Sequence, residues 1–429
     1  MAVPISASKP AGADSVWDGL QAIVGKDYLR AAGTGDMVAG IQPKIVLEPG
    51  TETELAAALR FANEAGITVI PRGGGTKLGW GNQPARADLI VSTARLNRII
   101  EHASADLTVG VEAGCPIQKL QNVLAESGQQ IAVDPLWPEQ ATVGGVLSTN
   151  DSGTLRIRYG GLRDLIIGAT IALPDGTVAS SGGKVVKNVA GFDLPKLVTG
   201  ALGTLGVITR AVFRLHPLPR NLRSFSFVAR DLEDANRILL AVLNSKLAYT
   251  GLQARFLGDK EAAVDVSLEG TDAGLAAQTE VLRNMAATAS ETGSGPTAWQ
   301  ARQELWSPAG TEVLAKFSVL PGSISEVAGR IQRLTNPVGV QWQAVVQATG
   351  LGWLRLDPGD VRHLSDLLPA LRSELEKMGG SMVVLRRPEG TAPIDAWGSG
   401  GDAFPLMLRV KQQFDPRGTL NPGRFIGGI

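Results

Sequence analysis

The sequence predicts an α+β protein of several domains, and three observations lead to this fold class. The chain has 429 residues, more than one hydrophobic core usually serves. Helix-like and strand-like segments alternate over residues 41–220, as expected for two small lobes that follow one another in the sequence. From residue 221 to about 390, a strand–helix–strand–strand–helix–strand pattern occurs and is then repeated. That pattern predicts an antiparallel sheet with helices on one face.

The first lobe opens with a well-defined helix. Thr51 followed by Glu54 forms a capping box, apolar residues recur after it at helical spacing, and Gly66 ends the helix. The elements expected next are a strand at 67–70, a glycine-rich loop, strands near 88–92 and 107–112, and a helix from Pro116 to Gly128.

The second lobe contains a predicted hairpin and ends at a pair of prolines. The turn Pro174-Asp175-Gly176 separates strands at 166–173 and 177–180. A helix is expected from Asp193 and a strand at 206–215, before Pro217 and Pro219 mark a boundary. We therefore expect four parts, namely an N-terminal extension with loose packing (1–40), the two-lobed domain (41–220), a sheet domain (221–390) and a C-terminal segment with one helix (391–429).

Composition narrows the classes of function. Forty-one basic residues balance 41 acidic ones, so charge gives no reason to expect nucleic acid as a partner. The single cysteine, Cys115, excludes a disulfide framework or a four-cysteine iron–sulfur site within the chain, and we expect it to be a buried, inert thiol. No signal peptide or transmembrane segment is expected, which favours a cytoplasmic protein.

Glycine is abundant, with 52 residues, and three glycine-containing segments are candidates for cofactor binding. The first, PRGGGT at 71–76, directly follows a predicted buried strand. Consecutive glycine amides can turn inward and surround a pyrophosphate, although the same loop could be only a structural turn. Neither GxGxxG nor GxxxxGK[ST] occurs, so the sequence does not support a Rossmann or P-loop site.

The second candidate is ATVGGVLSTNDSG at 141–153. Its glycine pair leaves room for a flat ring close to the backbone, and the polar residues after it offer hydrogen bonds to ring edges and phosphates. The alternative is a helix start that packs tightly against a sheet.

The third candidate is SGGKVVKNVAGFDL at 181–194, which leads to GTLGVIT at 203–209. Lys184 or Lys187 could stabilise negative charge on a reduced flavin. Alternatively, both lysines are solvated or pair with Asp193, which also suits a helix N-cap.

Taken in order with the tail DPRGTLNPGRF, these segments resemble the flavoproteins of the vanillyl-alcohol-oxidase type. GGKVVKNVAGFDLPKL and WGSGGDAFPLMLRVKQQFDPRGTLNPGRF resemble, in particular, the FAD-binding subunits of bacterial glycolate oxidases. The resemblance covers roughly residues 40–429. It implies a two-lobed FAD-binding domain, with the antiparallel sheet domain as a cap over the flavin ring.

The resemblance also implies the residues that would bind FAD. The glycine loop would hold the pyrophosphate, the second segment would line the flavin and its ribityl chain, and the start of the 206–215 strand would contact the adenine. The implied set is Pro71, Arg72, Gly73, Gly74, Gly75, Thr76, Asp134, Thr142, Val143, Gly144, Gly145, Asn150, Ser152, Gly153, Lys187, Gly206, Val207, Ile208 and Asn421.

Non-covalent FAD is expected, because Thr76 stands where covalently flavinylated relatives often have histidine after the glycine loop. As a subunit of a glycolate oxidase complex, the chain would act on glycolate or a related 2-hydroxy acid. It would pass electrons to a catalytic flavin subunit and an iron–sulfur subunit, and those partners could bring it to a membrane surface. Two alternatives remain open, namely a self-sufficient FAD oxidoreductase for another hydroxy acid or sugar alcohol, and a non-catalytic assembly subunit.

The sequence supplies no catalytic base or metal site that we can name. Its histidines, His102, His216 and His363, have no ligand spacing and are expected to be structural or exposed. Arg386 and Arg387 could hold a substrate carboxylate or simply end a solvated strand. Trp342, Trp353 and Trp397 are expected to pack in the core or between domains.

Overall fold

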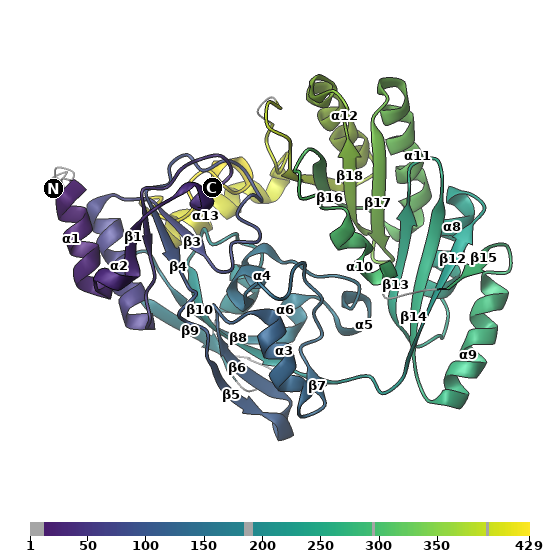
Figure 1. Ribbon diagram of the computed structural model, residues 1–429, viewed down its shortest axis with the longest axis horizontal. Coiled ribbons are helices and arrows are strands. Elements are labelled where there is room, and N and C mark those ends of the chain that lie inside the picture. Colours follow the sequence, from purple (N-terminus) through teal and green to yellow (C-terminus); the bar gives the residue numbers. More distant parts are fainter. Residues whose placement is uncertain (1–12, 184–191, 294–296, 392–393) are drawn as a thin grey trace.

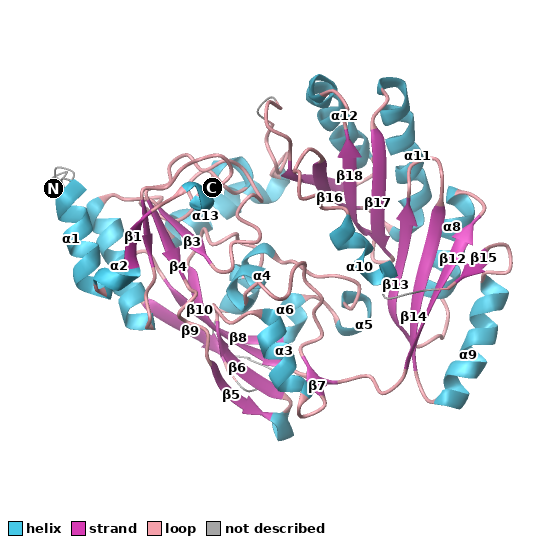
Figure 2. Cartoon of the chain, in the orientation of Figure 1, coloured by secondary structure: helices cyan, strands magenta, loops and turns pink. Residues whose placement is uncertain are grey.

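The structure is a computed structural model that describes residues 13–183, 192–293, 297–391 and 394–429 (Figure 1). Two lobes lie on one side, and a large antiparallel sheet with its helices lies on the other (Figure 2). The α+β fold class with a two-lobed domain and a cap is thereby confirmed.

The first lobe is a four-stranded sheet covered by two helices. Its strand order is β1-β2-β4-β3, and β4 pairs in parallel with both β2 and β3. The elements are α1 (Ala13–Val24), β1 (Leu29–Ala31), β2 (Ile45–Leu47), α2 (Glu52–Ala65), β3 (Val69–Arg72) and β4 (Leu89–Ser92).

The capping prediction for α2 is half right. Thr51 Oγ1 accepts a hydrogen bond from the N–H of Glu54, and Gly66 ends the helix in the left-handed conformation. The Glu54 carboxylate, however, accepts from the N–H of Gly50, so the reciprocal bond of a full capping box is absent.

The expectation of loose packing for residues 1–40 is wrong where the structure describes them. Leu20 on α1 is fully buried, and Leu29 on β1 is nearly so. Both belong to the core that also contains Leu55 and Leu59 of α2. The apolar residues of α1, from Val16 to Val24, recur at helical spacing and pack against α2, a signal that the expectation overlooked.

The second lobe is a five-stranded antiparallel sheet of order β5-β6-β10-β8-β9. The predicted hairpin is present, because β8 and β9 pair in register from Gly168–Gly182 to Ala172–Val178. The elements of this lobe are β5 (Ile99–Ala103), β6 (Thr108–Glu112), α3 (Ile117–Ala125), β7 (Gln129–Gln130), α4 (Val143–Thr149), α5 (Arg156–Tyr159), α6 (Leu162–Leu165), β8 (Ile166–Ala172), β9 (Val178–Gly182), α7 (Leu194–Val198), β10 (Val207–Arg214) and β11 (His216–Pro217).

The cap is an eight-stranded sheet of order β15-β12-β14-β13-β17-β18-β16-β19 in which neighbouring strands are antiparallel. Residues of α8, α9, α11 and α12 pack on one face of the sheet, whereas Leu314, Trp353 and Leu385 lie on the face that meets the lobes. The elements are β12 (Leu222–Ala229), α8 (Leu232–Leu243), β13 (Tyr249–Phe256), β14 (Ala262–Glu269), α9 (Asp272–Met285), β15 (Ser290–Thr292), α10 (Thr297–Glu304), β16 (Val313–Ser318), α11 (Ile324–Thr335), β17 (Gln341–Gln347), β18 (Leu351–Asp357), α12 (Leu364–Lys377) and β19 (Ser381–Arg386).

The C-terminal segment returns from the cap to the first lobe. Its helix α13 (Phe404–Phe414) carries the buried Lys411, which donates hydrogen bonds to Thr204 O, Leu420 O and the Asp415 carboxylate. Beyond the helix, Leu420 forms a bridge beside β3. These bonds hold the end of the chain against β3 and beside Thr204 of the second lobe.

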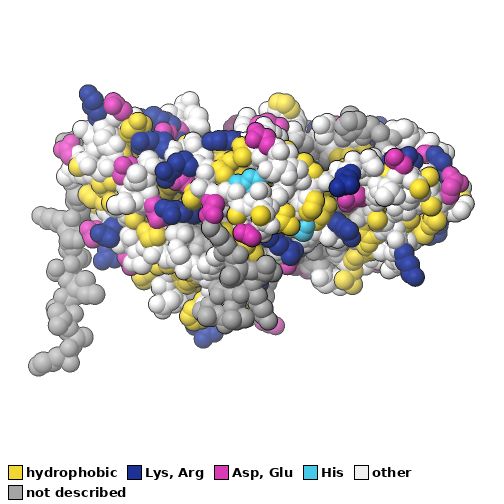
Figure 3. Space-filling view, turned by 90° about the horizontal axis from the view of Figure 1, so that it is seen from below, with side chains coloured by type: hydrophobic (Ala, Val, Ile, Leu, Met, Phe, Trp, Pro, Cys, Tyr) yellow, Lys and Arg dark blue, Asp and Glu magenta, His cyan; other side chains and the backbone are white. Residues whose placement is uncertain are grey.

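A separate apolar cluster joins the lobes to the cap. Trp80 and Leu136 come from the lobes, and Trp353, Leu314 and Leu385 come from the cap sheet. On the face in Figure 3, basic and acidic side chains are interspersed. Within the described residues, no helix is long and apolar enough to cross a membrane.

We expect Cys115 to be unreactive in the folded protein. Its side chain is fully buried, and burial raises the pKa of the thiol, so little thiolate forms at pH 8. A thiol reagent such as dithionitrobenzoate should label less than about a tenth of the folded protein in the time that labels all of it in guanidinium. Rapid stoichiometric labelling of the folded protein would contradict this packing.

Candidate functional site

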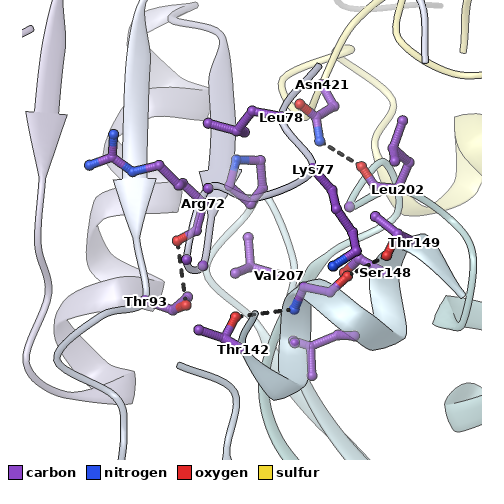
Figure 4. Close-up of a pocket in the computed structure, with 18 of the residues that line it drawn as sticks. Arg72, Lys77, Leu78, Thr93, Thr142, Ser148, Thr149, Leu202, Val207 and Asn421 are labelled. Atoms are coloured by element: carbon purple, nitrogen blue, oxygen red, sulfur yellow. Dashed lines mark hydrogen bonds between the residues drawn. The ribbon is translucent and has the colours of Figure 1, made fainter. Parts of the chain in front are cut away.

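A cavity lies between the two lobes, where the end of β3, the helix α4 and the start of β10 converge (Figure 4). The C-terminal segment closes one side through Asn421 and Arg424. The two glycine segments and the 203–209 segment thus contribute to one cavity, although they are far apart in the sequence.

The glycine loop packs directly against the start of α4. A Cβ atom on Gly74 would overlap the carbonyl oxygen of Gln140, and one on Gly73 would overlap the Thr142 hydroxyl. Gly75 has φ 75°, which favours glycine. Packing against the start of α4 therefore requires glycine at these positions. The absence of side chains also leaves the backbone of the loop open to the cavity.

The lining of this cavity is cationic. Among its residues in the described part of the chain, Arg72, Lys77 and Arg424 are basic and none is acidic. Burial lowers the pKa of Arg424 to about 10, which still leaves it charged at neutral pH, and its Nε has no hydrogen-bond partner. An anionic diphosphate suits this electrostatic setting.

Asn421 offers an unused acceptor inside the cavity. Its backbone N–H donates to Val69 O beside β3, its φ of 46° is in the left-handed region, and its side chain lines the cavity. Its Nδ2 donates to Leu202 O at 2.6 Å, as Figure 4 shows. Its Oδ1 is buried without a partner. The cations, the open backbone and this orphaned acceptor together fit the polar groups of FAD.

Most of the predicted cofactor-binding residues line this cavity. They are Pro71, Arg72, Gly73, Gly74, Gly75, Thr76, Thr142, Gly144, Gly145, Gly206, Val207, Ile208 and Asn421. The predicted Lys187, like its alternative Lys184, lies outside the described residues. The remaining predictions, Asp134, Val143, Asn150, Ser152 and Gly153, are not in its lining.

Asp134 organises a turn. Its carboxylate accepts hydrogen bonds from the N–H groups of Gly153 and Leu155 and from the Thr154 hydroxyl. Burial raises the pKa of Asp134, against the opposing effects of Arg302 and these donors. The structure thus supports a structural role for this residue.

The helix α4 begins at Val143 and is followed by Asn150 at its C-cap, and Ser152 lies two residues further on. Val143 is fully buried in the core of the second lobe, and Thr142 caps the helix by accepting from the N–H of Gly145. Asn150 ends the helix with φ 47° and lines a neighbouring cavity. The Ser152 carbonyl accepts a hydrogen bond from Arg302. The helix-start interpretation of this segment is therefore correct, and the cavity lies against that helix.

Sequence reasoning missed a buried ionic network beside the cavity. Asp151 is fully buried and contacts Lys77 Nζ at 3.2 Å and Arg302 Nη1 at 3.0 Å. Burial would raise the pKa of Asp151, but the charges of Arg302 and Lys77 hold it below its ordinary value. The cavity between the two lobes is called the cofactor cavity below. Through Lys77, the network joins this cavity to helix α10 of the cap, which carries Arg302.

A second cavity, of about 220 Å³, lies between the lobes and the cap sheet. It shares Ser148, Thr149 and Leu202 with the first cavity, so the two are neighbours. Lys316 on β16 lines it, and within the described residues no carboxylate lies within ion-pair distance of its Nζ. Its charge faces the Trp353 ring at 5.8 Å. Burial lowers the pKa of Lys316 to about 8. The single lysine within the apolar strand VLAKFS could have indicated this second cavity from the sequence alone.

The other candidates have structural partners. Arg386 Nη1 contacts Glu312 at 2.6 Å, and Arg387 donates to Ile394 O. His102 shares a hydrogen bond with Gln129, and His216 packs on Tyr159. Asp193 caps α7 by accepting from the N–H of Lys196. Among the residues that the structure describes, no group of three or more His, Cys, Asp or Glu could hold a metal ion.

Comparison with known protein sequences identifies an FAD-binding domain in this chain. Residues 43–182 match the FAD binding domain family. The D-lactate dehydrogenase of Archaeoglobus fulgidus is 28% identical over 417 residues, covering 89% of this chain and 91% of that protein. The D-2-hydroxyglutarate dehydrogenase of Xanthomonas citri is 25% identical over 426 residues, covering 89% of each. The Bacillus subtilis protein named glycolate oxidase subunit GlcD is 29% identical over 211 residues, covering 49% of this chain and 45% of that protein.

Solved structures show the same fold at low sequence identity. A p-cresol methylhydroxylase aligns with a TM-score of 0.79 at 18% identity, covering 96% of both chains. An alkyldihydroxyacetonephosphate synthase aligns with a TM-score of 0.75 at 17% identity, covering 98% of this chain and 88% of the other. The chain is therefore an FAD-dependent oxidoreductase built on the two-lobed FAD-binding fold of the vanillyl-alcohol-oxidase type.

Proposed function

We propose that this protein oxidises a small 2-hydroxy acid to the 2-oxo acid. Relatives named as D-lactate, D-2-hydroxyglutarate and glycolate enzymes support oxidation at a CH–OH group. When bound, FAD supplies the acceptor for the hydride equivalent that leaves the substrate carbon. Glycolate or a close relative is the substrate that we propose.

The observation that carries this proposal is the position of Lys316. Its ammonium group faces a cavity next to the cofactor cavity and has no carboxylate partner among the described residues. Such a charge, partly removed from water, favours an anionic group nearby. Lys316 would hold the substrate carboxylate and orient the hydroxyl-bearing carbon, while Ser318 and Ser381 offer further hydrogen bonds from neighbouring strands.

We also propose that FAD is held without a covalent bond and that the chain works as a subunit of a glycolate oxidase complex. Thr76 lines the cofactor cavity where a histidine could otherwise attach the flavin. The similarity to the protein named subunit GlcD supports a complex. Its partners would be a catalytic flavin subunit and an iron–sulfur subunit, which would receive the electrons. We place this assembly in the cytoplasm, peripheral to a membrane through its partners.

An anaerobic absorption spectrum of the purified chain, recorded before and after adding glycolate, tests the proposal. Flavin bands that bleach would support turnover by this chain alone. Bands that bleach only after the partner subunits are added would support the complex. A colourless protein that stays colourless after incubation with FAD would refute the proposal and leave an assembly role.

We expect Lys316→Gln to weaken glycolate binding by about 10- to 100-fold, the loss typical of a charge-assisted hydrogen bond. Because the Lys316 pKa is lowered to about 8, the ammonium is present below pH 8 and is lost above it. The KM of the wild-type protein should therefore rise as the pH passes 8, and that of the variant should not. If the chain needs its partners for turnover, the affinity for glycolate of the wild type and the variant can be compared instead from glycolate-induced shifts of the flavin spectrum.

Lys377→Gln is the matched control, since Lys377 is exposed and pairs with Glu374 far from the cavity. It should leave glycolate binding and its pH dependence unchanged. Equal effects of the two substitutions, or a KM for Lys316→Gln that still rises above pH 8, would contradict the role given to Lys316.

A further inference from the structure

A third cavity, of about 530 Å³, lies against the middle strands of the cap sheet, and it shares no lining residue with the two cavities described above. It lies between α3 and β7 of the second lobe and β13, β17, β18 and α10 of the cap. Nine amide side chains line it, namely Gln118, Gln121, Asn122, Gln129, Gln130, Gln253, Gln300, Gln303 and Gln347.

Gln347 at the floor of this cavity has no partner for either atom of its amide. Only 2% of the residue is exposed, and both Oε1 and Nε2 are buried without a hydrogen bond. Trp353 on the adjacent strand is also 2% exposed, and its Nε1–H is unpartnered. Buried polar groups in native proteins nearly always have partners, so these donors and this acceptor need a ligand or ordered water in the cavity.

The charged groups at this cavity are already satisfied or stand at its edge. Arg302 donates to Asp134 O, Ser152 O and the Asp151 carboxylate. The Asp134 carboxylate accepts three hydrogen bonds from its own turn. Glu139 is exposed. The hydrogen-bonding capacity that remains in the buried part of the lining is therefore neutral, unlike the cationic lining of the cavity between the two lobes.

Several of these amides already bond within the protein, among them Gln121 to Ile131 and Gln253 to Asp265. The unpartnered amide of Gln347 both donates and accepts, as each hydroxyl group of a polyol does. Trp299 adds an apolar ring to the wall, and its Nε1 is tied to Ser224 Oγ at 3.0 Å, so the ring is held in place. Such a ring suits the C–H face of a sugar. The volume lies within the range of small-molecule pockets.

We propose that this cavity is a binding site for a neutral polyhydroxylated compound, a sugar or a polyol, separate from the flavin site. Gln347 and Gln253 face each other in register on β17 and β13 and form the floor. Gln300 and Gln303 on α10 are exposed and form the rim.

The test is isothermal titration of the full chain with D-glucose and maltose, with D-gluconate as a charged comparator and adenosine as an aromatic one. We expect a neutral sugar to bind with a Kd in the millimolar range or below, and the two comparators at least tenfold more weakly. Gln347→Leu should weaken sugar binding at least tenfold. It should not lower the thermal midpoint of the protein without sugar, because it removes only unpartnered polar atoms.

Gln343→Leu is the matched control, on the same strand and the same sheet face but outside the cavity lining. It should leave sugar binding unchanged. No binding of either sugar, tighter binding of gluconate or adenosine, or equal losses in the two variants would overturn the proposal. A strong loss of stability in Gln347→Leu would do the same, because it would make that glutamine a structural residue.

Discussion

Gly74→Ala is expected to yield a folded protein that retains less than about a tenth of the wild-type FAD. The added Cβ would overlap the carbonyl oxygen of Gln140 and lie 2.8 Å from its carbonyl carbon. Both are backbone atoms just before α4, and they cannot move aside as a flexible side chain would. The loop must therefore shift, and overpacking of this kind costs about 1–3 kcal/mol. The ratio of absorbance at 450 nm to that at 280 nm after gel filtration measures the retained flavin.

Gly79→Ala is the control for that experiment. Gly79 lies a few residues beyond the loop, a Cβ there would meet nothing within 4 Å, and its backbone is not in the left-handed region. We expect this variant to retain FAD as the wild type does. Full flavin retention by Gly74→Ala, with unchanged circular dichroism, would show that the loop does not hold the diphosphate.

Two of the segments that line the cavity between the lobes could be recognised from the sequence because their features are local. A glycine loop directly after a buried strand, and a capped turn at Thr142, depend on neighbouring residues, and both line the cavity as expected. The returning Asn421 was placed only through the resemblance to known flavoproteins. Spacing alone gives no reason why the last residues of the chain should lie beside β3.

The ionic network and the third cavity could not be predicted, because they depend on packing between domains. Asp151 lies inside a segment that drew attention for its glycines and amides, and its partner Arg302 is 151 residues away. Asp134 attracted a cofactor role because it precedes that segment, but its acceptors are used by the turn at Gly153. The sequence alone does not distinguish a carboxylate that accepts hydrogen bonds from nearby backbone N–H groups from one that binds a ligand.

The same network gives the second large effect. Asp151→Asn is expected to lower the free energy of unfolding by about 3–5 kcal/mol, because it leaves the Lys77 and Arg302 charges buried without a counter-charge. Chemical denaturation monitored by tryptophan fluorescence measures this change. Asp360→Asn, at an exposed pair with Arg362, should leave the curve unchanged.

A second substitution and an acid titration separate loss of charge balance from simple loss of packing. If uncompensated charge is the cause, Arg302→Met combined with Asp151→Asn should recover part of the loss, since the two residues are in contact and their effects are not additive. The sign of the pH effect follows from the lowered pKa of Asp151, because its contribution is present above the ordinary aspartate pKa of about 3.9 and is lost as the pH falls further. The wild-type protein should therefore lose more stability than Asp151→Asn on acidification. Parallel acid curves, together with strictly additive losses in the double variant, would show that the ion pairs do not couple the cofactor loop to the cap.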